Sequence, residues 1–118
     1  MWRTEPTSGW QLSALNFSQT NPKEMAALVR NLRHYLAQLN VSRNHKSIEA
    51  LYLHNEVSSI VSLNQKGMED DLEDSRLYLF PDESRRILYL LCVGKEATRN
   101  ADMEFCKMAT LYIVNERT

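Results

Sequence analysis

An uninterrupted apolar run, from Ile87 to Val93, constrains the fold more than any other feature of the sequence. The side chains of a β-strand alternate between its two faces, so a strand with seven consecutive apolar residues must be covered on both faces. Turn-forming residues at 81–84 precede the run, and Gly94 follows it. The pattern predicts the central strand of a sheet that has other elements packed on either side.

A second strand is expected over 76–80, directly before the turn. Leu77 and Leu79 fall on one face of this strand, and Arg76 and Tyr78 fall on the other. Because a short turn joins two apolar strands, the sequence predicts an antiparallel hairpin.

A helix is predicted to begin at residues 21–24. Asn21 can cap a helix, and Pro22 suits the first helical position because it has no amide hydrogen to leave unpaired. Glu24 has the spacing that completes a capping box. The apolar residues that follow recur at intervals of three and four up to about Asn40, which places them on one helical face.

Four further segments complete the expected order: a short strand over 10–17, a short helix over 47–54, a strand over 57–63 and a closing helix over about 102–113. Thr98 or Asn100 can cap the closing helix. The order strand, helix, helix, strand, strand, strand, helix predicts an α+β fold, with helices packed on a small, mainly antiparallel sheet. At 118 residues the chain has the size of a single domain, expected to span 1–118.

The composition excludes several classes of protein. With 43% hydrophobic and 25% charged residues, the chain is typical of a globular protein and not of a disordered one. Its formal net charge is −1, so it could bind nucleic acid or a membrane only through a local patch. We find no apolar core of signal-peptide length and no membrane span of ~20 residues, so we expect a cytoplasmic protein with no membrane partner.

The acidic residues and the cysteines suggest simple structural roles. The acidic run over 69–74 is expected to form a solvated loop, with a metal site or an antagonist-binding site as the alternative. Cys92 and Cys106 lie in apolar segments without CxxC spacing. We expect them to be buried free thiols in a reducing compartment.

Several catalytic and metal-binding motifs are absent from the sequence: the glycine-rich phosphate loop, the metalloprotease helix, the nucleophile elbow and the paired-cysteine metal site. We therefore expect neither a metal nor a cofactor. A surface or core position is the simpler interpretation for all three histidines, His34, His45 and His54. His54 is the best candidate among them for an acid or base, because it precedes a strand and an imidazole titrates near neutral pH.

Basic residues near the ends of the two predicted strands are the main chemical candidates. Arg76 begins the first strand, and Lys95 and Arg99 follow the second. If the sheet forms as expected, these cations converge at one edge, where they could bind phosphate and stabilise the charge that develops in phosphodiester cleavage. Ordinary surface cations are the alternative interpretation. The tyrosines that could stack on bases, or that are core or interface residues instead, are Tyr78, Tyr89 and Tyr112.

A resemblance to the RelE/ParE-type toxins, in particular their HigB-like, phage-derived branch, is carried by residues 76–109, which read RLYLFPDESRRILYLLCVGKEATRNADMEFCKMA. In that family an arginine-bearing strand, a hairpin and a strongly apolar strand lead through a basic and polar segment into a closing helix. The matching features here are Arg76, the run 87–93, Gly94, Lys95, Thr98 and Arg99. The resemblance implies a RelE-like fold with the order β-α-α-β-β-β-α.

The resemblance also implies a function, that of the toxin in a toxin–antitoxin pair. Such a toxin is an mRNA endoribonuclease, ribosome-dependent or acting on free mRNA, that inhibits translation without a metal. Its partners would be mRNA or the ribosome and a cognate antitoxin protein. The implied catalytic or phosphate-binding residues are Arg76 and Lys95, with Arg99 added because it is close to them in sequence. Further candidate RNA contacts are Lys46, His54, Tyr78, Arg85 and Arg86.

Two alternative functions stay open. The net charge of −1 and the acidic run would suit a non-catalytic protein-interaction module that keeps the RelE-like fold. A gyrase-directed, ParE-like toxin would share the same fold, and the sequence does not separate it from a ribonuclease.

Overall fold

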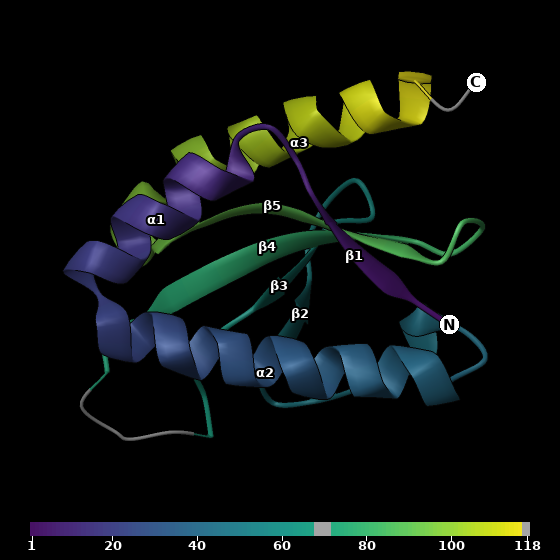
Figure 1. The fold of residues 1–118 in the computed structure, drawn as a ribbon, viewed down its shortest axis with the longest axis horizontal. Helices are drawn as coiled ribbons and strands as arrows, with labels where there is room; N and C mark the ends of the chain where they lie inside the picture. Colours follow the sequence, from purple (N-terminus) through teal and green to yellow (C-terminus); the bar gives the residue numbers. More distant parts are fainter. Residues whose placement is uncertain (68–71, 117–118) are drawn as a thin grey trace.

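A computed structural model describes residues 1–67 and 72–116 (Figure 1). Over these residues the elements follow in the order β1 (Arg3–Pro6), α1 (Trp10–Thr20), α2 (Pro22–Val41), the 3-10 turn η1 (His45–Ser47), β2 (Leu53–Asn55), β3 (Val61–Leu63), β4 (Ser75–Asp82), β5 (Ile87–Lys95), the 3-10 turn η2 (Glu96–Thr98) and α3 (Arg99–Glu116). The strands form one sheet in the order β1-β5-β4-β3-β2, in which β1 is parallel to β5 and the other neighbours are antiparallel. The predicted α+β class, with helices packed on a mainly antiparallel sheet, is confirmed.

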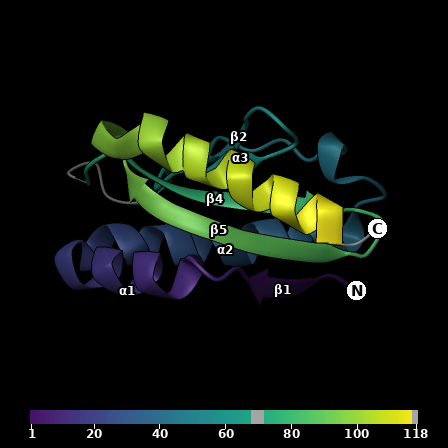
Figure 2. The same ribbon diagram turned by 90° about the horizontal axis from the view of Figure 1, so that it is seen from above.

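Strand β5 is covered on both faces, as its sequence predicts. Every residue from Ile87 to Gly94 is buried. Helix α2 packs on one face of the sheet and α3 on the other (Figure 1), and the view in Figure 2 shows α3 crossing over β5 and β4. Leu28 of α2 belongs to the core on the first face, and Cys106 of α3 belongs to the core on the second.

A β-bulge in β5 adds an apolar side chain to the α3 side of the sheet. Tyr78 of β4 pairs with Cys92, but the next residue, Leu79, pairs with Leu90. Leu91 is therefore the extra residue of the bulge, and Leu91 and Cys92 both belong to the core beneath α3. The predicted β4–β5 hairpin is confirmed, with this irregularity in its register.

The two cysteines face each other between β5 and α3. The Sγ atoms of Cys92 and Cys106 lie 3.3 Å apart. Both residues are free and buried, which confirms that part of the prediction.

The strand predicted over 10–17 is wrong, because these residues lie in helix α1. Its apolar residues Trp10, Ala14 and Phe17 follow helical spacing and pack into the core beside α2. Ser13 Oγ accepts a hydrogen bond from Val93 N at 3.0 Å and donates one to Val93 O at 3.1 Å. Beyond the end of β1, the helix therefore supplies the hydrogen-bond partner for the edge of β5. A longer β1 would otherwise have to supply it.

Strand β1 has no counterpart among the predicted elements. All four of its residues are exposed, so it has no apolar alternation by which a sequence pattern would find it. It is held instead by backbone pairing, in which Arg3 N donates to Arg86 O at 3.1 Å.

The helix predicted over 47–54 is wrong, and the strand predicted over 57–63 is shorter than expected. Leu53–Asn55 forms β2, which pairs with β3, and pairing between distant segments outweighs the local helical spacing. Ser58 and Ser59 have φ angles of 57° and 64°, so they form the turn between the two strands. Strand β3 therefore begins only at Val61.

Helix α2 agrees with the predicted span, but the capping box does not form. The side chain of Asn21 caps no backbone amide. Glu24 Oε2 instead accepts a hydrogen bond from Glu73 N at 3.1 Å, which ties the start of α2 to the segment before β4. Residues 69–71 of the predicted acidic loop lie outside the described part of the chain.

The closing helix is longer than predicted. Helix α3 follows Thr98 directly and continues to Glu116. No helix in residues 1–67 and 72–116 combines the length and apolarity needed to cross a membrane.

The Leu91→Ala substitution is expected to lower the free energy of unfolding by about 2–5 kcal/mol, because it leaves a cavity in the core beneath α3. Leu91 has no exposed surface, whereas Leu51 is 87% exposed. The matched substitution Leu51→Ala should therefore change stability by less than about 0.5 kcal/mol. Urea denaturation followed by circular dichroism measures both, and equal losses in the two variants would contradict the packing described.

Candidate functional site

A row of side chains crosses the sheet on the face that carries α3. From β2 to β5, the successive cross-strand partners in this row are His54, Ser62, Tyr78 and Cys92. Tyr78 and Cys92 are buried in the core beneath α3. Arg76 lies two residues before Tyr78 on β4, so it shares this face, at the end of the sheet where α3 begins.

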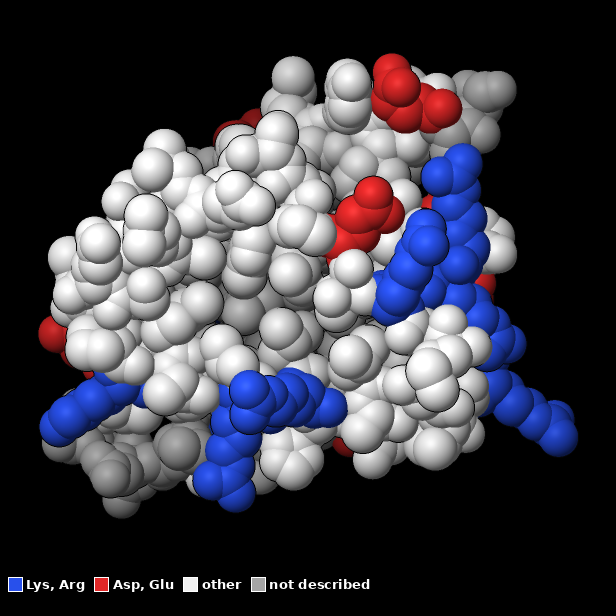
Figure 3. All heavy atoms as spheres, viewed as in Figure 1, with Lys and Arg blue, Asp and Glu red and all other residues white. Residues whose placement is uncertain are grey.

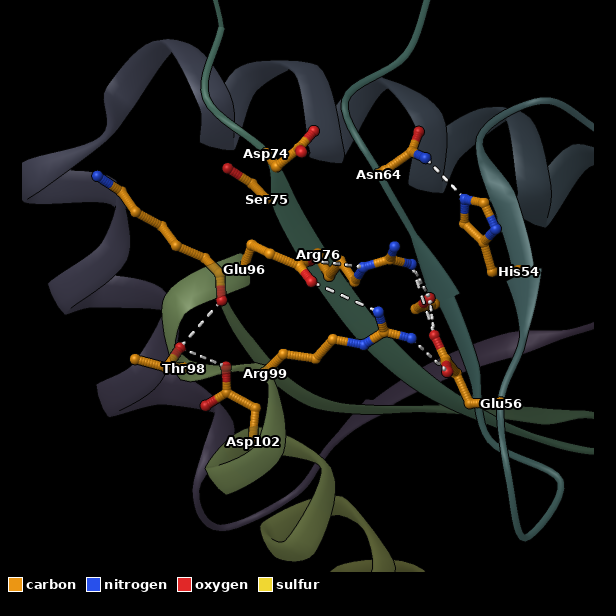
Figure 4. A network of polar contacts seen from close by, with 12 residues as sticks. His54, Glu56, Asn64, Asp74, Ser75, Arg76, Glu96, Thr98, Arg99 and Asp102 are labelled. Carbon is orange, nitrogen blue, oxygen red and sulfur yellow. Dashed lines mark hydrogen bonds and ion pairs between the residues drawn. The ribbon is translucent and has the colours of Figure 1, made fainter.

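Arg76 and Arg99 converge at this end of the sheet (Figure 4). Glu56 lies between them: its Oε2 is 3.5 Å from Arg76 Nη1, and its Oε1 is 3.6 Å from Arg99 Nη2. Glu96 bridges the same pair, with Oε2 at 3.6 Å from Arg76 Nε and Oε1 at 3.5 Å from Arg99 Nη1. Two guanidinium groups and two carboxylates thus form one closed set of ion pairs.

The two carboxylates differ in how firmly they are held. Ser62 Oγ donates to Glu56 Oε2 at 2.7 Å and accepts from Arg76 Nη1 at 3.2 Å. The side chain of Glu56 is only 10% exposed, whereas that of Glu96 is 51% exposed. Glu56 is therefore the fixed anion of the cluster, and Glu96 is the one that an incoming anion could displace.

His54 lies beside the cluster, and its surroundings favour its neutral form. Asn64 Nδ2 donates to His54 Nε2 at 2.7 Å, and Asn64 Oδ1 accepts from Lys66 N at 3.0 Å, which fixes the orientation of the amide. Burial, and next the positive charge of Arg76, lower the pKa of His54 below 6.5. Nε2 is thus an acceptor turned toward Asn64 and away from the two arginines (Figure 4).

Lys95 does not join the arginines. Its Nζ lies 2.6 Å from Glu73 Oε2, outside the cluster. The neighbouring glycine has a packing role: Gly94 pairs with Arg76, and a Cβ there would clash with the side chains of Asp102 and Thr98.

The other candidate RNA contacts fall into two groups. Tyr78 is buried, so its ring offers no surface to a base, and burial raises the pKa of its hydroxyl well above the usual range. Lys46, Arg85 and Arg86 are exposed, but the arginines lie in the turn at the far end of β4 from Arg76. Of the other tyrosines, Tyr89 is buried and Tyr112 is exposed.

A pocket of about 430 Å³ opens beside the ion-pair cluster. It is lined by Glu56, Val57, Glu96, Ala97, Arg99, Asn100, Met103 and Lys107. A volume of this size is within the range of small-ligand pockets, roughly 300–1,000 Å³. Arg99 lines it directly, whereas Arg76 does not line it and is joined to it through its ion pairs with Glu56 and Glu96, which do.

The carboxylates of the cluster were missed by sequence reasoning. Glu96 precedes Arg99 by three residues, a spacing that brings the two side chains together on a helical turn and could have been noticed. Glu56 carries no such signal, because only the pairing of β2, β3 and β4 brings it to Arg76.

No metal site is available to this cluster. Within the described residues, no group of three or more His, Cys, Asp or Glu side chains could hold a metal ion.

The sequence matches no protein-family model, and searches of curated proteins and of solved structures give no match.

The Arg76→Gln substitution is expected to move the pKa of His54 upward, toward 6.5, because it removes a positive charge that opposes protonation. Burial, the larger cause, is unchanged, so the pKa should stay below 6.5. NMR titration of the imidazole C–H signals measures the shift. Arg33→Gln, on the exposed surface of α2, is the control and should have no effect.

The lowered pKa of His54 also makes the stability of the folded protein depend on pH. The unfolded chain binds the His54 proton more readily than the folded protein does. The stability linked to this group is therefore present above the unfolded pKa of 6.5 and is lost as the pH falls from there through the folded pKa.

An unchanged His54 pKa in Arg76→Gln would contradict the placement of Arg76 beside the imidazole.

Proposed function

We propose that the protein is a metal-independent endoribonuclease, the toxin of a toxin–antitoxin pair that inhibits translation by cutting mRNA in the cytoplasm. Its partners would be mRNA or the ribosome and a cognate antitoxin protein. The observation that carries this proposal is the carboxylate of Glu56, fixed between two guanidinium groups beside an open pocket. The RelE-like fold belongs to the proposal, and it is supported by two helices before the main strands and a closing helix on the opposite face.

Cleavage of RNA without a metal requires a proton acceptor for the 2′-hydroxyl and cations for the phosphorane that forms. In the proposed reaction, Glu56 accepts the 2′-hydroxyl proton while the 2′-oxygen bonds to phosphorus. The bond from phosphorus to the 5′-oxygen breaks, and that oxygen takes a proton from water at the open side of the pocket. The products are a 2′,3′-cyclic phosphate and a 5′-hydroxyl end.

The arginines would hold the phosphate in this reaction. A phosphodiester that enters the pocket displaces the exposed carboxylate of Glu96 and takes its place between Arg76 and Arg99. Guanidinium groups suit this role because they donate paired hydrogen bonds to phosphate oxygens and stay charged at every relevant pH. Glu56 remains in position because Ser62 and Arg76 both hold it.

Glu56→Gln is expected to reduce the rate of RNA cleavage by about 10²–10⁴-fold, the usual contribution of a positioned general base. Arg99→Ala should reduce it by about 10²–10³-fold, as expected for loss of one group that stabilises transition-state charge. Lys95→Ala should retain nearly full activity, because Lys95 is paired with Glu73 outside the cluster. Cleavage of a labelled RNA by purified protein, and growth of bacteria that express each variant, measure these effects.

The control for these variants is Arg33→Ala, which removes an exposed cation of α2 distant from the pocket. Thermal unfolding shows whether each variant is folded. Equal activity in Glu56→Gln and in the parent protein would exclude Glu56 as the base. Loss of activity in Lys95→Ala but not in Arg99→Ala would place the site elsewhere.

A non-catalytic interaction module is the second candidate, and the charge balance of the cluster favours it. Two carboxylates neutralise the two guanidinium groups, as in a purely structural ion-pair network. This function predicts normal growth and intact transcripts with the parent protein as well as with Glu56→Gln. Growth arrest with intact transcripts would instead indicate a gyrase-directed, ParE-like toxin.

A further inference from the structure

Five exposed cations gather at the end of the molecule opposite the Arg76–Arg99 cluster. Blue side chains line the right edge of Figure 3, where Figure 1 places the N-terminus, η1 and the β4–β5 turn. These residues, here called the basic end, are Arg3, Arg43, Lys46, Arg85 and Arg86.

Backbone contacts hold the segments of the basic end together. Arg3 N donates to Arg86 O at 3.1 Å, which joins β1 to the β4–β5 turn. His45 N donates to Glu83 Oε1 at 2.7 Å, which brings the neighbouring Lys46 to the same turn. The basic end is therefore built on ordered segments that are distant in sequence.

The basic end has an unbalanced charge. Among the residues that the structure describes, no salt bridge involves any of its five cations, whereas Arg76 and Arg99 are each paired with two carboxylates. Two carboxylates also lie at the β4–β5 turn: Asp82, which is buried, and Glu83, which accepts a hydrogen bond from the backbone of His45 and contacts its ring. The five cations outnumber these two carboxylates, so this end is positive in a chain whose net charge is −1.

A second pocket lies next to the proposed catalytic pocket and includes one residue of the basic end, Lys46. It has a volume of about 280 Å³ and is lined by His45, Lys46, Asn55, Glu56, Ser59, Ile60 and Val61. Glu56 also lines the pocket that contains Arg99. Both pockets therefore lie beside Glu56, on the surface between Lys46 and Arg99.

We propose that the basic end binds the phosphate backbone of the same RNA strand whose scissile phosphate occupies the Arg76–Arg99 pocket. Four of its five cations are arginines, which bind phosphate oxygens through paired hydrogen bonds. The contact is to the backbone, so it adds affinity without selecting a sequence. This inference rests on the proposed function for the identity of the strand.

The length of β4 sets the size of the RNA segment. Asp82 lies six positions after Arg76, which at ~3.3 Å per residue is about 20 Å. At the ~3.4 Å per nucleotide of a stacked duplex strand this distance corresponds to about six nucleotides, and it corresponds to fewer in an extended single strand, whose spacing is longer. An oligonucleotide of about two nucleotides therefore reaches only the pocket, and one of about twelve reaches both the pocket and the basic end.

Binding of uncleavable 2′-O-methyl oligonucleotides, measured by fluorescence anisotropy over a range of salt concentrations, tests the inference. For the longer oligonucleotide, the Arg85→Ala/Arg86→Ala variant should weaken binding and reduce the slope of log K against log salt by about 1.4, or ~0.7 per lost phosphate contact. Binding of the shorter one should not change. The control variant Lys23→Ala/Arg33→Ala removes the same charge from the exposed surface of α2 and should leave both slopes unchanged.

Equal slopes in the two double variants would overturn the inference, because net charge alone would then explain the binding. Binding of the parent protein to anionic phospholipid vesicles but not to the longer oligonucleotide would also overturn it. The nuclease is tested separately, since the oligonucleotides cannot be cut. A protein that cleaves no RNA but shows the slope change would support the basic end and refute the nuclease.

Discussion

Burial of β5 on both faces is the constraint on which the rest of the structure depends. A strand with apolar side chains on both sides needs an apolar partner above and below it, and α2 and α3 supply the two. Its backbone also needs partners on both edges. Strand β4 provides one edge, while β1 and then Ser13 of α1 provide the other. The N-terminal third of the chain is therefore arranged around the needs of a strand near the C-terminus.

The candidate site forms where this apolar face ends. Tyr78 and Cys92 belong to the core beneath α3, and the neighbouring position on the same face of β4 is Arg76. The chain turns from β5 into α3 at this point, which brings Arg99 to Arg76 and packs the side chains of Thr98 and Asp102 against Gly94. The pocket is thus a consequence of the junction between the central strand and the closing helix.

The two ends of the sheet differ in electrostatic character. At the α3 end, each arginine is paired with Glu56 and Glu96, and the charges sum to zero. At the opposite end, no salt bridge among the described residues involves the cations of the basic end, and Glu83 at the same turn is paired with His45. A single elongated ligand with regularly spaced negative charge would match both ends, because it could replace Glu96 at one end and neutralise the cations at the other.

Local pattern predicted the parts of this fold that are locally determined. Helix α2 and the β4–β5 hairpin follow from apolar spacing and turn residues, and the convergence of Arg76 with Arg99 follows from placing both near the same junction. Strands β1 and β2 depend on pairing with segments far away in sequence, and their own residues carry no alternation that reveals it. Glu56 was not predicted for the same reason, because only the pairing of three strands brings it to Arg76.

Glu56 links the stability of this end of the sheet to its proposed chemistry. Arg76 is only 18% exposed at the edge of an apolar core, so its charge needs a partner that folding supplies. Glu56 is that partner, and Ser62 fixes it in place. Removing one member of a partly buried ion pair costs more than the pair contributes, because the other charge is left without compensation. A carboxylate held in this way is pre-oriented before any ligand arrives, which is what a general base requires. The same ion pair that allows Arg76 to be buried therefore also positions the group proposed to accept the proton.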